Sequence, residues 1–285
     1  MLTADLLVPR TTQLCGLDVT YYDSEDEGRH PGETLVMIHG TGGTTAGHFG
    51  YLFPVLAAKQ RVLAFDWADP TGGDRKLELE DLVEQAIEGI EKLAAGTKVT
   101  LMGYSLGACV VTAVAARRPD LVSKLITLCG WAKTDVQQEI RNSVWEQLRA
   151  LDDDSALRRY SVFCAFSGEW LTQLPPDMLP QMYGAFGFTP FIDAQMELNR
   201  RVDIVDELEK ITAPTLVMSC TRDIMVPTRH QKQLFGGIDN ARFVEMASGH
   251  GVVFERPSEI CNHVQEFLDH PDKYAAGTII PTPQP

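Results

Sequence analysis

Six short apolar runs, separated by segments with helical periodicity, constrain the fold more than any other feature of the sequence. The runs are TLVMIHG (34–40), RVLAFDW (61–67), KVTLMGY (98–104), KLITLCG (124–130), TLVMSC (215–220) and ARFVEM (241–246). Their apolar residues are continuous rather than alternating, which is typical of strands covered on both faces. Apolar residues recur at helical spacing in the segments 48–60, 77–95 and 105–122. The alternation predicts an α/β fold with a doubly wound, mostly parallel sheet and right-handed crossovers.

One connection in this series is too long for a simple crossover. No buried strand is evident between Gly130 and Thr215, and the segments 135–151, 154–174, 175–186 and 189–208 are typical of helices punctuated by Pro and Gly. Structureless loops of this length are uncommon in compact domains. We therefore expect residues 131–205 to form a helical cap, inserted in a core made of residues 1–130 and 206–271. Residues 272–285 are expected to be a flexible tail.

The third apolar run ends in the sequence GYSLG, residues 103–107, directly before a helical segment. Small residues on both sides of Ser105 permit a tight turn between a strand and a helix. Such a turn holds the hydroxyl at the carboxyl end of the sheet, beside a helix N-terminus that favours negative charge. A serine becomes a strong nucleophile only when a base, oriented by a carboxylate, accepts its proton. Asp223 and His250 each follow one of the last two apolar runs, so both should reach the same sheet edge as Ser105.

Four motifs in a fixed order extend this pattern along most of the chain. They are HG (39–40), GYSLG (103–107), DxxVP (223–227) and GH followed by ERP (249–257). With these motifs the chain resembles the α/β-hydrolase superfamily over about residues 16–269.

The resemblance implies a cofactor-free serine hydrolase with a catalytic triad beneath a helical cap. Ser105 would be the nucleophile, His250 the base and Asp223 the acid. The backbone N–H groups of Thr41 and Leu106 would form the oxyanion hole. The implied reaction is cleavage of a carboxylic ester, lactone or thioester through an acyl-enzyme on Ser105.

Alternatives to these assignments stay open on the sequence alone. His39 lies close enough in the pattern to be the base, although the resemblance gives it the role of bracing the oxyanion loop. Asp135, after the preceding apolar run, could replace Asp223 as the acid. His48 either begins a helix or lines the pocket, and receives no role. After Asp66 the chain reads DWADPTGGDRK, without the Arg and Ser that many relatives carry, so the substrate of a familiar subfamily does not transfer.

The expected cap is rich in aromatic and Met side chains, part of which must pack the cap itself. An aromatic lid over a serine indicates a medium-sized, apolar acyl or ring substrate. The residues expected to contact substrate are Gly40 and Tyr104 in the core and Phe163, Phe166, Trp170, Phe186 and Phe188 in the cap.

The composition excludes several other classes of protein. The 25 Lys and Arg against 39 Asp and Glu give a net charge of −14, which disfavours binding to nucleic acids. The sequence has no GxGxxG after a strand, no P-loop and no histidine cluster with metal-ligand spacing, so neither a cofactor nor a metal is expected. C–C bond hydrolysis, acyl transfer or cyclisation, and a non-hydrolytic small-molecule receptor remain compatible with the same scaffold.

The cysteines and the N-terminal segment give an indication of the cellular compartment of the protein. None of the six cysteines forms a CxxC pair, and most lie in apolar runs, which favours buried free thiols in a reducing cytoplasm. The first 16 residues lack the pattern of a signal peptide, and no apolar run reaches 18 residues. We therefore expect a cytoplasmic protein without a membrane span; the sequence leaves its oligomeric state open.

Overall fold

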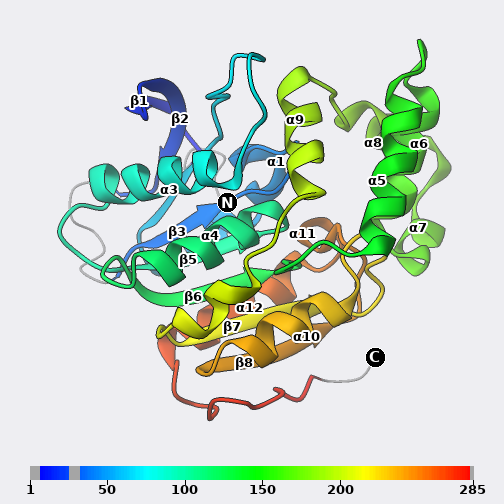
Figure 1. Ribbon diagram of the computed structural model, residues 1–285. Helices are drawn as coiled ribbons and strands as arrows, with labels where there is room; N and C mark the ends of the chain where they lie inside the picture. Colours follow the sequence, from blue (N-terminus) through cyan, green and yellow to red (C-terminus); the bar gives the residue numbers. More distant parts are fainter. Residues whose placement is uncertain (1–6, 26–32, 283–285) are drawn as a thin grey trace.

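An eight-stranded, mostly parallel sheet forms the centre of the molecule in the computed structural model, which describes residues 7–25 and 33–282 (Figure 1). The strand order is β1-β2-β4-β3-β5-β6-β7-β8. The strands are β1 (Arg10–Leu14), β2 (Leu17–Asp23), β3 (Leu35–Ile38), β4 (Val62–Phe65), β5 (Val99–Tyr104), β6 (Val122–Leu128), β7 (Thr215–Cys220) and β8 (Ala241–Met246). Strands β3 to β8 pair in parallel, whereas β1 with β2 and β2 with β4 pair antiparallel. The predicted fold class is confirmed.

The six apolar runs correspond to β3 to β8, but the sequence patterns do not predict the hairpin β1–β2. Its turn is made by Cys15 and Gly16, which both have positive φ (50° and 75°). Only Leu14 of β1 and only Val19 and Tyr22 of β2 are buried, and the other residues of the two strands are exposed or half-buried. An edge hairpin of this kind gives a weaker signal than a continuous apolar run. All six cysteines are free thiols, as expected; five of them are buried and Cys15 is exposed.

Helices cover both faces of the sheet, and the core divides accordingly into two hydrophobic clusters. Alternate residues of one strand join different clusters: Val36 and Ile38 belong to the first, Leu35 and Met37 to the second. This two-sided burial is the reason why the central strands read as continuous apolar runs. The helices against the first cluster are α3 (Leu79–Leu93), α4 (Leu106–Arg117) and α10 (Thr228–Gly237); those against the second are α1 (Thr45–Phe49), α2 (Leu52–Leu56), α11 (Val252–Glu255) and α12 (Pro257–Asp269).

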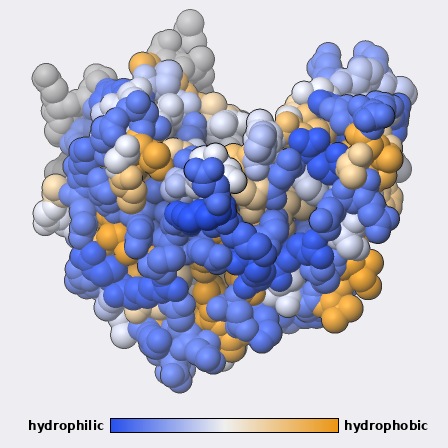
Figure 2. All heavy atoms as spheres, turned by 45° about the horizontal axis from the view of Figure 1, so that its top comes forward, coloured by the Kyte–Doolittle hydropathy of each residue, from blue (hydrophilic) through white to orange (hydrophobic). Residues whose placement is uncertain are grey.

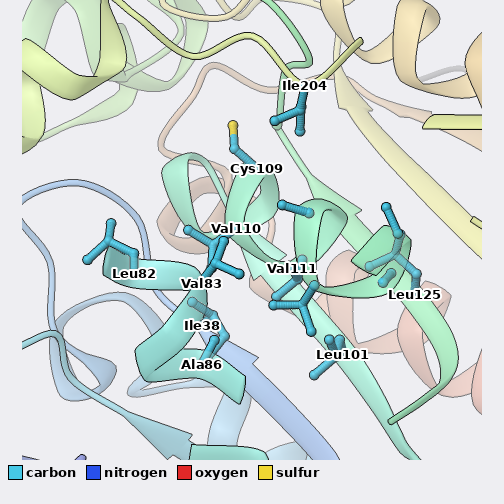
Figure 3. Close-up of a cluster of buried hydrophobic side chains, with 14 of the residues drawn as sticks. Ile38, Leu82, Val83, Ala86, Leu101, Cys109, Val110, Val111, Leu125 and Ile204 are labelled. Atoms are coloured by element: carbon cyan, nitrogen blue, oxygen red, sulfur yellow. The ribbon is translucent and has the colours of Figure 1, made fainter. Parts of the chain in front are cut away.

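Helix α4 lies at the centre of the first cluster. Figure 3 shows Val110 and Val111 of α4 between Leu101 of the sheet and Val83 of α3. Every residue from Leu106 to Ala116 is buried, so no face of this helix is available to solvent. Helix α4 therefore fixes the position of the residue at its N-terminus, Ser105, relative to the sheet.

Between β6 and β7 the chain forms the helices that the sequence predicts, and we call residues 131–205 the helical insertion. Its elements are α5 (Val136–Arg149), α6 (Ser155–Ala165), α7 (Gly168–Gln173), η2 (Pro176–Met178), α8 (Leu179–Ala185) and α9 (Pro190–Asn199), and η3 (Val205–Lys210) follows it. An antiparallel bridge between Lys133 and Asp203 joins the two ends of the insertion. Figure 1 shows α5 to α8 at one end of the sheet, with α9 returning toward the core.

The expectation that residues 272–285 form a flexible tail has to be corrected, because part of this segment is bonded to strand β8. Gly277 N donates to Ala241 O (2.8 Å), Ile280 N donates to Phe243 O (2.7 Å), and Phe243 N donates to Thr278 O (3.0 Å). Strand β8 is at the edge of the sheet, and the segment satisfies backbone groups that this edge would otherwise leave unpaired. Ile280 is also buried in the second cluster. The prediction of a loose extension is therefore wrong for residues 277–280; residues 283–285 lie outside the described part of the chain.

Within residues 7–25 and 33–282, none of the helices combines the length and the apolar character that a membrane crossing requires. Residues 1–6, on which part of the expectation about a signal peptide depends, lie outside the described residues.

The docked tail gives a first testable prediction. Ile280→Ala removes a side chain that is only 8% exposed. We expect it to lower the free energy of unfolding by about 2 kcal/mol, the lower end of the range for buried Ile to Ala changes, and the melting temperature by roughly 4–8 °C. The matched control is Ile279→Ala, at a neighbouring side chain that is 58% exposed. Equal melting temperatures of the two variants would contradict the docked position of the tail.

Candidate active site

Ser105 sits on a strained turn between β5 and α4. Its backbone has φ 56° and ψ −122°, in a region that side-chain-bearing residues rarely adopt. Its N–H still donates to Leu128 O of the neighbouring strand at 2.9 Å, and its carbonyl already accepts from Ala108 N of the helix. The chain thus changes from strand to helix within one residue.

The glycines of the GYSLG sequence are required by close approach of backbones. A Cβ on Gly103 would lie 2.3 Å from Gly107 O, and a Cβ on Gly107 would lie 2.3 Å from Ile38 O. Both distances are shorter than any real contact, and the opposing atoms are backbone. Gly40 is restricted in the same way, since its Cβ would lie 2.8 Å from the Cβ of Ser105. Glycine is therefore needed where strand, helix and the loop after β3 meet.

The three predicted catalytic side chains form one hydrogen-bonded line. His250 Nε2 lies 2.9 Å from Ser105 Oγ, and His250 Nδ1 lies 2.7 Å from Asp223 Oδ2. The other carboxylate oxygen of Asp223 accepts from Met225 N and Val226 N, each at 2.8 Å. All three residues of the line are buried. Asp223 is thus held by backbone donors in the orientation that directs it at the imidazole.

The loops that carry Asp223 and His250 are bonded to each other and to the elbow. Arg222 N donates to Ser248 O at 3.0 Å, which joins the loop after β7 to the loop after β8. Tyr104 OH donates to His250 O at 2.8 Å. The carboxyl ends of three parallel strands therefore position the line of side chains as a unit.

The two alternative assignments are not supported by the geometry. His39 donates from Nδ1 to Gly40 O at 2.8 Å, and its Nε2 accepts from Trp67 N at 3.2 Å, so both ring nitrogens are occupied away from Ser105. Burial lowers the pKa of His39, consistent with a neutral ring. Asp135 caps α5 by accepting from Gln138 N, and it pairs with Arg229. Neither side chain takes part in the line that ends at Ser105.

The expected oxyanion hole has donors available. Among the described residues, no backbone acceptor is found for the N–H groups of Thr41 and Leu106. Helix α9 of the insertion holds the Thr41 loop: Gln195 Oε1 accepts from Gly42 N (3.0 Å), and Asn199 Nδ2 donates to Thr41 Oγ1 (3.0 Å). Sequence reasoning misses Gln195 and Asn199. The only signal for them in the sequence is a pair of amide side chains spaced four residues apart, which places both on one face of the expected helix.

His48, which received no role from the sequence, lines the cavity above Ser105. Its Nδ1 accepts from Gly40 N at 3.3 Å, and its ring meets Tyr104 edge to face at 5.0 Å. Burial, followed by the influence of His39 and His250, lowers the pKa of His48 to about 3. The ring is therefore neutral at ordinary pH and contributes shape rather than charge.

The helical insertion also holds the loop that carries His250. Gly251 N donates to Ala165 O at 2.6 Å. The carboxylate of Glu255 accepts from Ser167 N (2.7 Å), from Ser167 Oγ (2.6 Å) and from Gly249 N (3.2 Å). The junction between α6 and α7 is thus fixed against the residues on both sides of His250.

A cavity of about 830 Å³ opens above Ser105 and His250. Figure 2 shows the surface hollowed between the part that carries the insertion and the rest of the molecule. Tyr104, Phe166, Trp170, Phe186 and Phe188 line the cavity, and Phe166 stacks on Trp170 with ring centroids 4.5 Å apart.

Two residues that the sequence analysis expects to contact substrate, Phe163 and Gly40, do not line this cavity, so the prediction is corrected for both. Phe163 lies on the outer side of α6 and is 64% exposed. Phe166 follows directly after the end of α6 and turns inward. The spacing of the two residues in the sequence does not indicate that they point in different directions. Gly40 packs behind Ser105, where it has no room for a side chain.

One group of residues in the described part of the chain has the spacing of metal ligands: Cys129, Asp223 and His250, whose donor atoms all lie within 4.8 Å of one another. The oxygens of Asp223 already accept from His250 and from two backbone N–H groups. Burial raises the pKa of the Cys129 thiol well above its usual value, which disfavours the thiolate that a metal would need. We therefore treat Cys129 as part of the surroundings of Asp223.

Comparison with known proteins agrees with the fold. A sequence model described as the alpha/beta hydrolase family matches residues 35–263. The chain is 28% identical to pyrrolizixenacetamide deacetylase of Xenorhabdus hominickii over 85% of its own length and 92% of that protein. It is 25% identical to the putative carbamate hydrolase RutD of Rhizobium rhizogenes, covering 84% and 94% of the two chains. The crystal structure of the enol-lactonase from Burkholderia xenovorans LB400 matches with a TM-score of 0.75 at 20% identity, over 91% and 100% of the chains.

The geometry distinguishes the two candidate acids. Asp223→Asn should lower the turnover of a p-nitrophenyl ester on the order of 10⁴-fold, as loss of the orienting carboxylate does in the serine-protease example. Asp135→Asn is the matched control: Asn also caps helices well, and loss of the exposed pair with Arg229 costs at most about 1 kcal/mol. Its turnover should stay near that of the wild type. If Asp135→Asn lost turnover and Asp223→Asn did not, the acid would be Asp135, which follows β6.

The neutral state of His48 predicts a dependence of stability on pH. An unfolded histidine binds a proton below about pH 6.5, whereas folded His48 does so only near pH 3. Between these values the unfolded chain binds more protons, so stability is lost as the pH falls from about 6.5, by up to about 1.4 kcal/mol per pH unit for one proton. Denaturant titrations at pH 6.5 to 4.5 should show a shallower loss in His48→Gln.

Exposed His270 provides the control for this measurement. His270→Gln should follow the wild-type curve. If His48→Gln and His270→Gln lose stability with the same slope as the wild type, folded His48 is protonated normally and is not held neutral.

Proposed function

The chain belongs to the alpha/beta hydrolase family, and we propose that it is a serine hydrolase that cleaves a carboxylic ester, lactone or thioester through an acyl-enzyme on Ser105. The observation that carries the proposal is the line Ser105–His250–Asp223, with distances of 2.9 and 2.7 Å, at the floor of the cavity. A buried serine bonded to an oriented imidazole is the arrangement that activates a hydroxyl for attack on a carbonyl carbon.

In the first half of the reaction, His250 Nε2 accepts the Ser105 proton as Oγ attacks the acyl carbon. Asp223 keeps the proton of the imidazole on Nδ1 and stabilises the imidazolium that forms. The N–H groups of Thr41 and Leu106 are the donors for the oxyanion of the tetrahedral intermediate. His250 then gives its proton to the leaving group, which departs and leaves the acyl group on Ser105.

In the second half, a water molecule takes the place of the leaving group. His250 accepts one of its protons, the resulting hydroxide attacks the acyl carbon, and Ser105 recovers its proton as the acid product leaves. Each step uses side chains and backbone groups of this chain. A different acceptor at the water position would make the same acyl-enzyme perform acyl transfer or cyclisation.

We propose that the helical insertion, residues 131–205, is the cap of this site and that residues 1–130 and 206–271 are its core. The aromatic side chains of Phe166, Trp170, Phe186 and Phe188 border the cavity from the side of the insertion. A volume of about 830 Å³ suits an acyl or ring compound of medium size. The apolar lining favours a substrate whose body is hydrophobic.

A second candidate is hydrolysis of an amide. It is favoured by the similarity to a relative named as the deacetylase of an acetamide, since removal of an acetyl group from an acetamide breaks a C–N bond. The same triad and oxyanion donors would act, but His250 would have to protonate a poorer leaving group. Parallel assays of an ester, a lactone, a thioester and an anilide with one acyl group distinguish the two candidates, and C–C bond hydrolysis or a receptor predicts no turnover of any of them.

The identity of the nucleophile can be tested without the natural substrate. A fluorophosphonate probe should label the wild-type protein and should not label Ser105→Ala. Ser161→Ala is the matched control, because Ser161 also lines the cavity but makes no hydrogen bond to an imidazole. Its labelling should equal that of the wild type. Labelling that persists in Ser105→Ala, or disappears in Ser161→Ala, would overturn the proposed mechanism.

A further inference from the structure

One side chain gives the cavity wall a permanent charge. Among the described residues that line the cavity, Arg141 of α5 is the only Lys or Arg, and none is an Asp or Glu. This is unexpected on composition, because acidic residues outnumber basic ones by 39 to 25 in the whole chain. Asp223 lies behind His250 and does not line the cavity, so the wall carries one permanently charged side chain, and that charge is positive.

Arg141 has no carboxylate partner in the described part of the chain. In the same insertion, Arg149, Arg158 and Arg200 pair with Asp193, Asp154 and Glu139, respectively. The guanidinium of Arg141 donates instead to the neutral Oδ1 of Asn142, and its Nε is buried without an acceptor among the described residues. A guanidinium stays protonated in proteins, so this charge persists although burial lowers the pKa of Arg141.

Asn142 adds a second buried donor without a partner. The residue is 3% exposed, it also lines the cavity, and its Nδ2 has no acceptor among the described residues. Three titratable groups act on Arg141, and two of them, Tyr160 and Cys164, are neutral at ordinary pH, since burial raises the pKa of Tyr160 to about 12 and raises the pKa of Cys164. The third, Asp223, is not bonded to Arg141, and its two oxygens already accept from His250 and from two backbone N–H groups. Two buried donors and one charge that no carboxylate of the described residues binds thus border the same space.

Buried donors and charges are normally paired, because leaving them unpaired is unfavourable. A carboxylate is the group that matches this set, since it carries one negative charge and accepts several hydrogen bonds in one plane. We infer that Arg141 and Asn142 bind a carboxylate of the substrate, so that the compound cleaved at Ser105 is an acyl compound with an anionic end. This inference rests on the proposed function and adds the substrate class.

The rest of the lining agrees with such a compound. The stacked rings of Phe166 and Trp170 and the side chain of Met196 provide apolar contacts for the body of the substrate. A substrate with a hydrophobic body and one carboxylate would pack against the apolar side chains and pair with Arg141 and Asn142. A fully neutral substrate would leave the guanidinium desolvated and unpaired.

The test compares matched esters that differ only at the far end of the acyl chain. The pairs are p-nitrophenyl hexanoate with the adipate monoester, octanoate with the suberate monoester, and decanoate with the sebacate monoester. In at least one pair the wild type should have a kcat/KM about 10- to 100-fold higher for the carboxylate-ended ester, the range for hydrogen bonds to a charged group. In Arg141→Gln the ratio should fall to about one, mainly through KM.

Two further variants complete the comparison. Arg159→Gln is the matched control, because Arg159 lies on α6 and does not line the cavity; its ratio should equal that of the wild type. Asn142→Asp places a carboxylate beside Arg141 without a change of size, so it should abolish or reverse the preference even if Arg141→Gln does not fold. A wild-type preference for the neutral ester in every pair, or a preference that survives in Asn142→Asp, would overturn the inference.

A binding measurement separates this inference from the proposed reaction. Calorimetry with Ser105→Ala compares 4-phenylbutyrate with the neutral 4-phenylbutanamide. The acid should bind at least about tenfold more tightly, and Arg141→Gln in the same background should remove the difference. Equal affinities would overturn the carboxylate site whatever the esters show. Loss of all turnover with retained, Arg141-dependent binding of the acid would instead overturn the hydrolase and keep the site.

Discussion

The close approach of three backbones at Ser105 is the constraint on which the site depends. Strand β5, helix α4 and the loop after β3 meet there with no space for a Cβ on Gly40, Gly103 or Gly107. The strained conformation of Ser105 costs on the order of 1–3 kcal/mol. The buried helix α4 and the sheet offset this cost, because neither can relax without opening a cavity in the first hydrophobic cluster. Packing far from the site thus maintains the geometry of the hydroxyl.

Burial has opposite electrostatic consequences for the groups around this serine. His39 and His48 are kept neutral by burial, which for His39 outweighs the influence of the Asp66 carboxylate 4.0 Å from its Nε2. His250 differs from them in having a carboxylate oxygen of Asp223 at 2.7 Å from its Nδ1. The three histidines therefore have different surroundings, and of the three only His250 is hydrogen-bonded to Ser105. His39 and His48 each make a hydrogen bond to the backbone of Gly40 and so hold the loop after β3.

Local patterns were sufficient to predict much of the fold and the meeting of Ser105, Asp223 and His250. Parallel strands deliver their carboxyl ends to one edge, so three loops that follow three apolar runs had to converge. Features that depend on tertiary contacts were not predictable. The tail at Ile280 is held by an edge strand, and the hairpin at Cys15 has few buried residues. Phe163 lies on the exposed side of α6, whereas Phe166 turns inward just after the end of that helix. The holding of the Thr41 loop by α9 joins residues that lie more than 150 positions apart.

The attachment of the insertion to both loops around the cavity limits how substrate preference can diverge among descendants of this chain. Helix α9 holds the Thr41 loop, and the α6–α7 junction holds the His250 loop through Glu255. A substitution at either contact displaces a loop of the site together with the wall of the cavity, so the two cannot change independently. Helices α7 and α8 contain no buried residues, yet Trp170 and Met182 border the cavity. This segment is where new specificities can accumulate one mutation at a time.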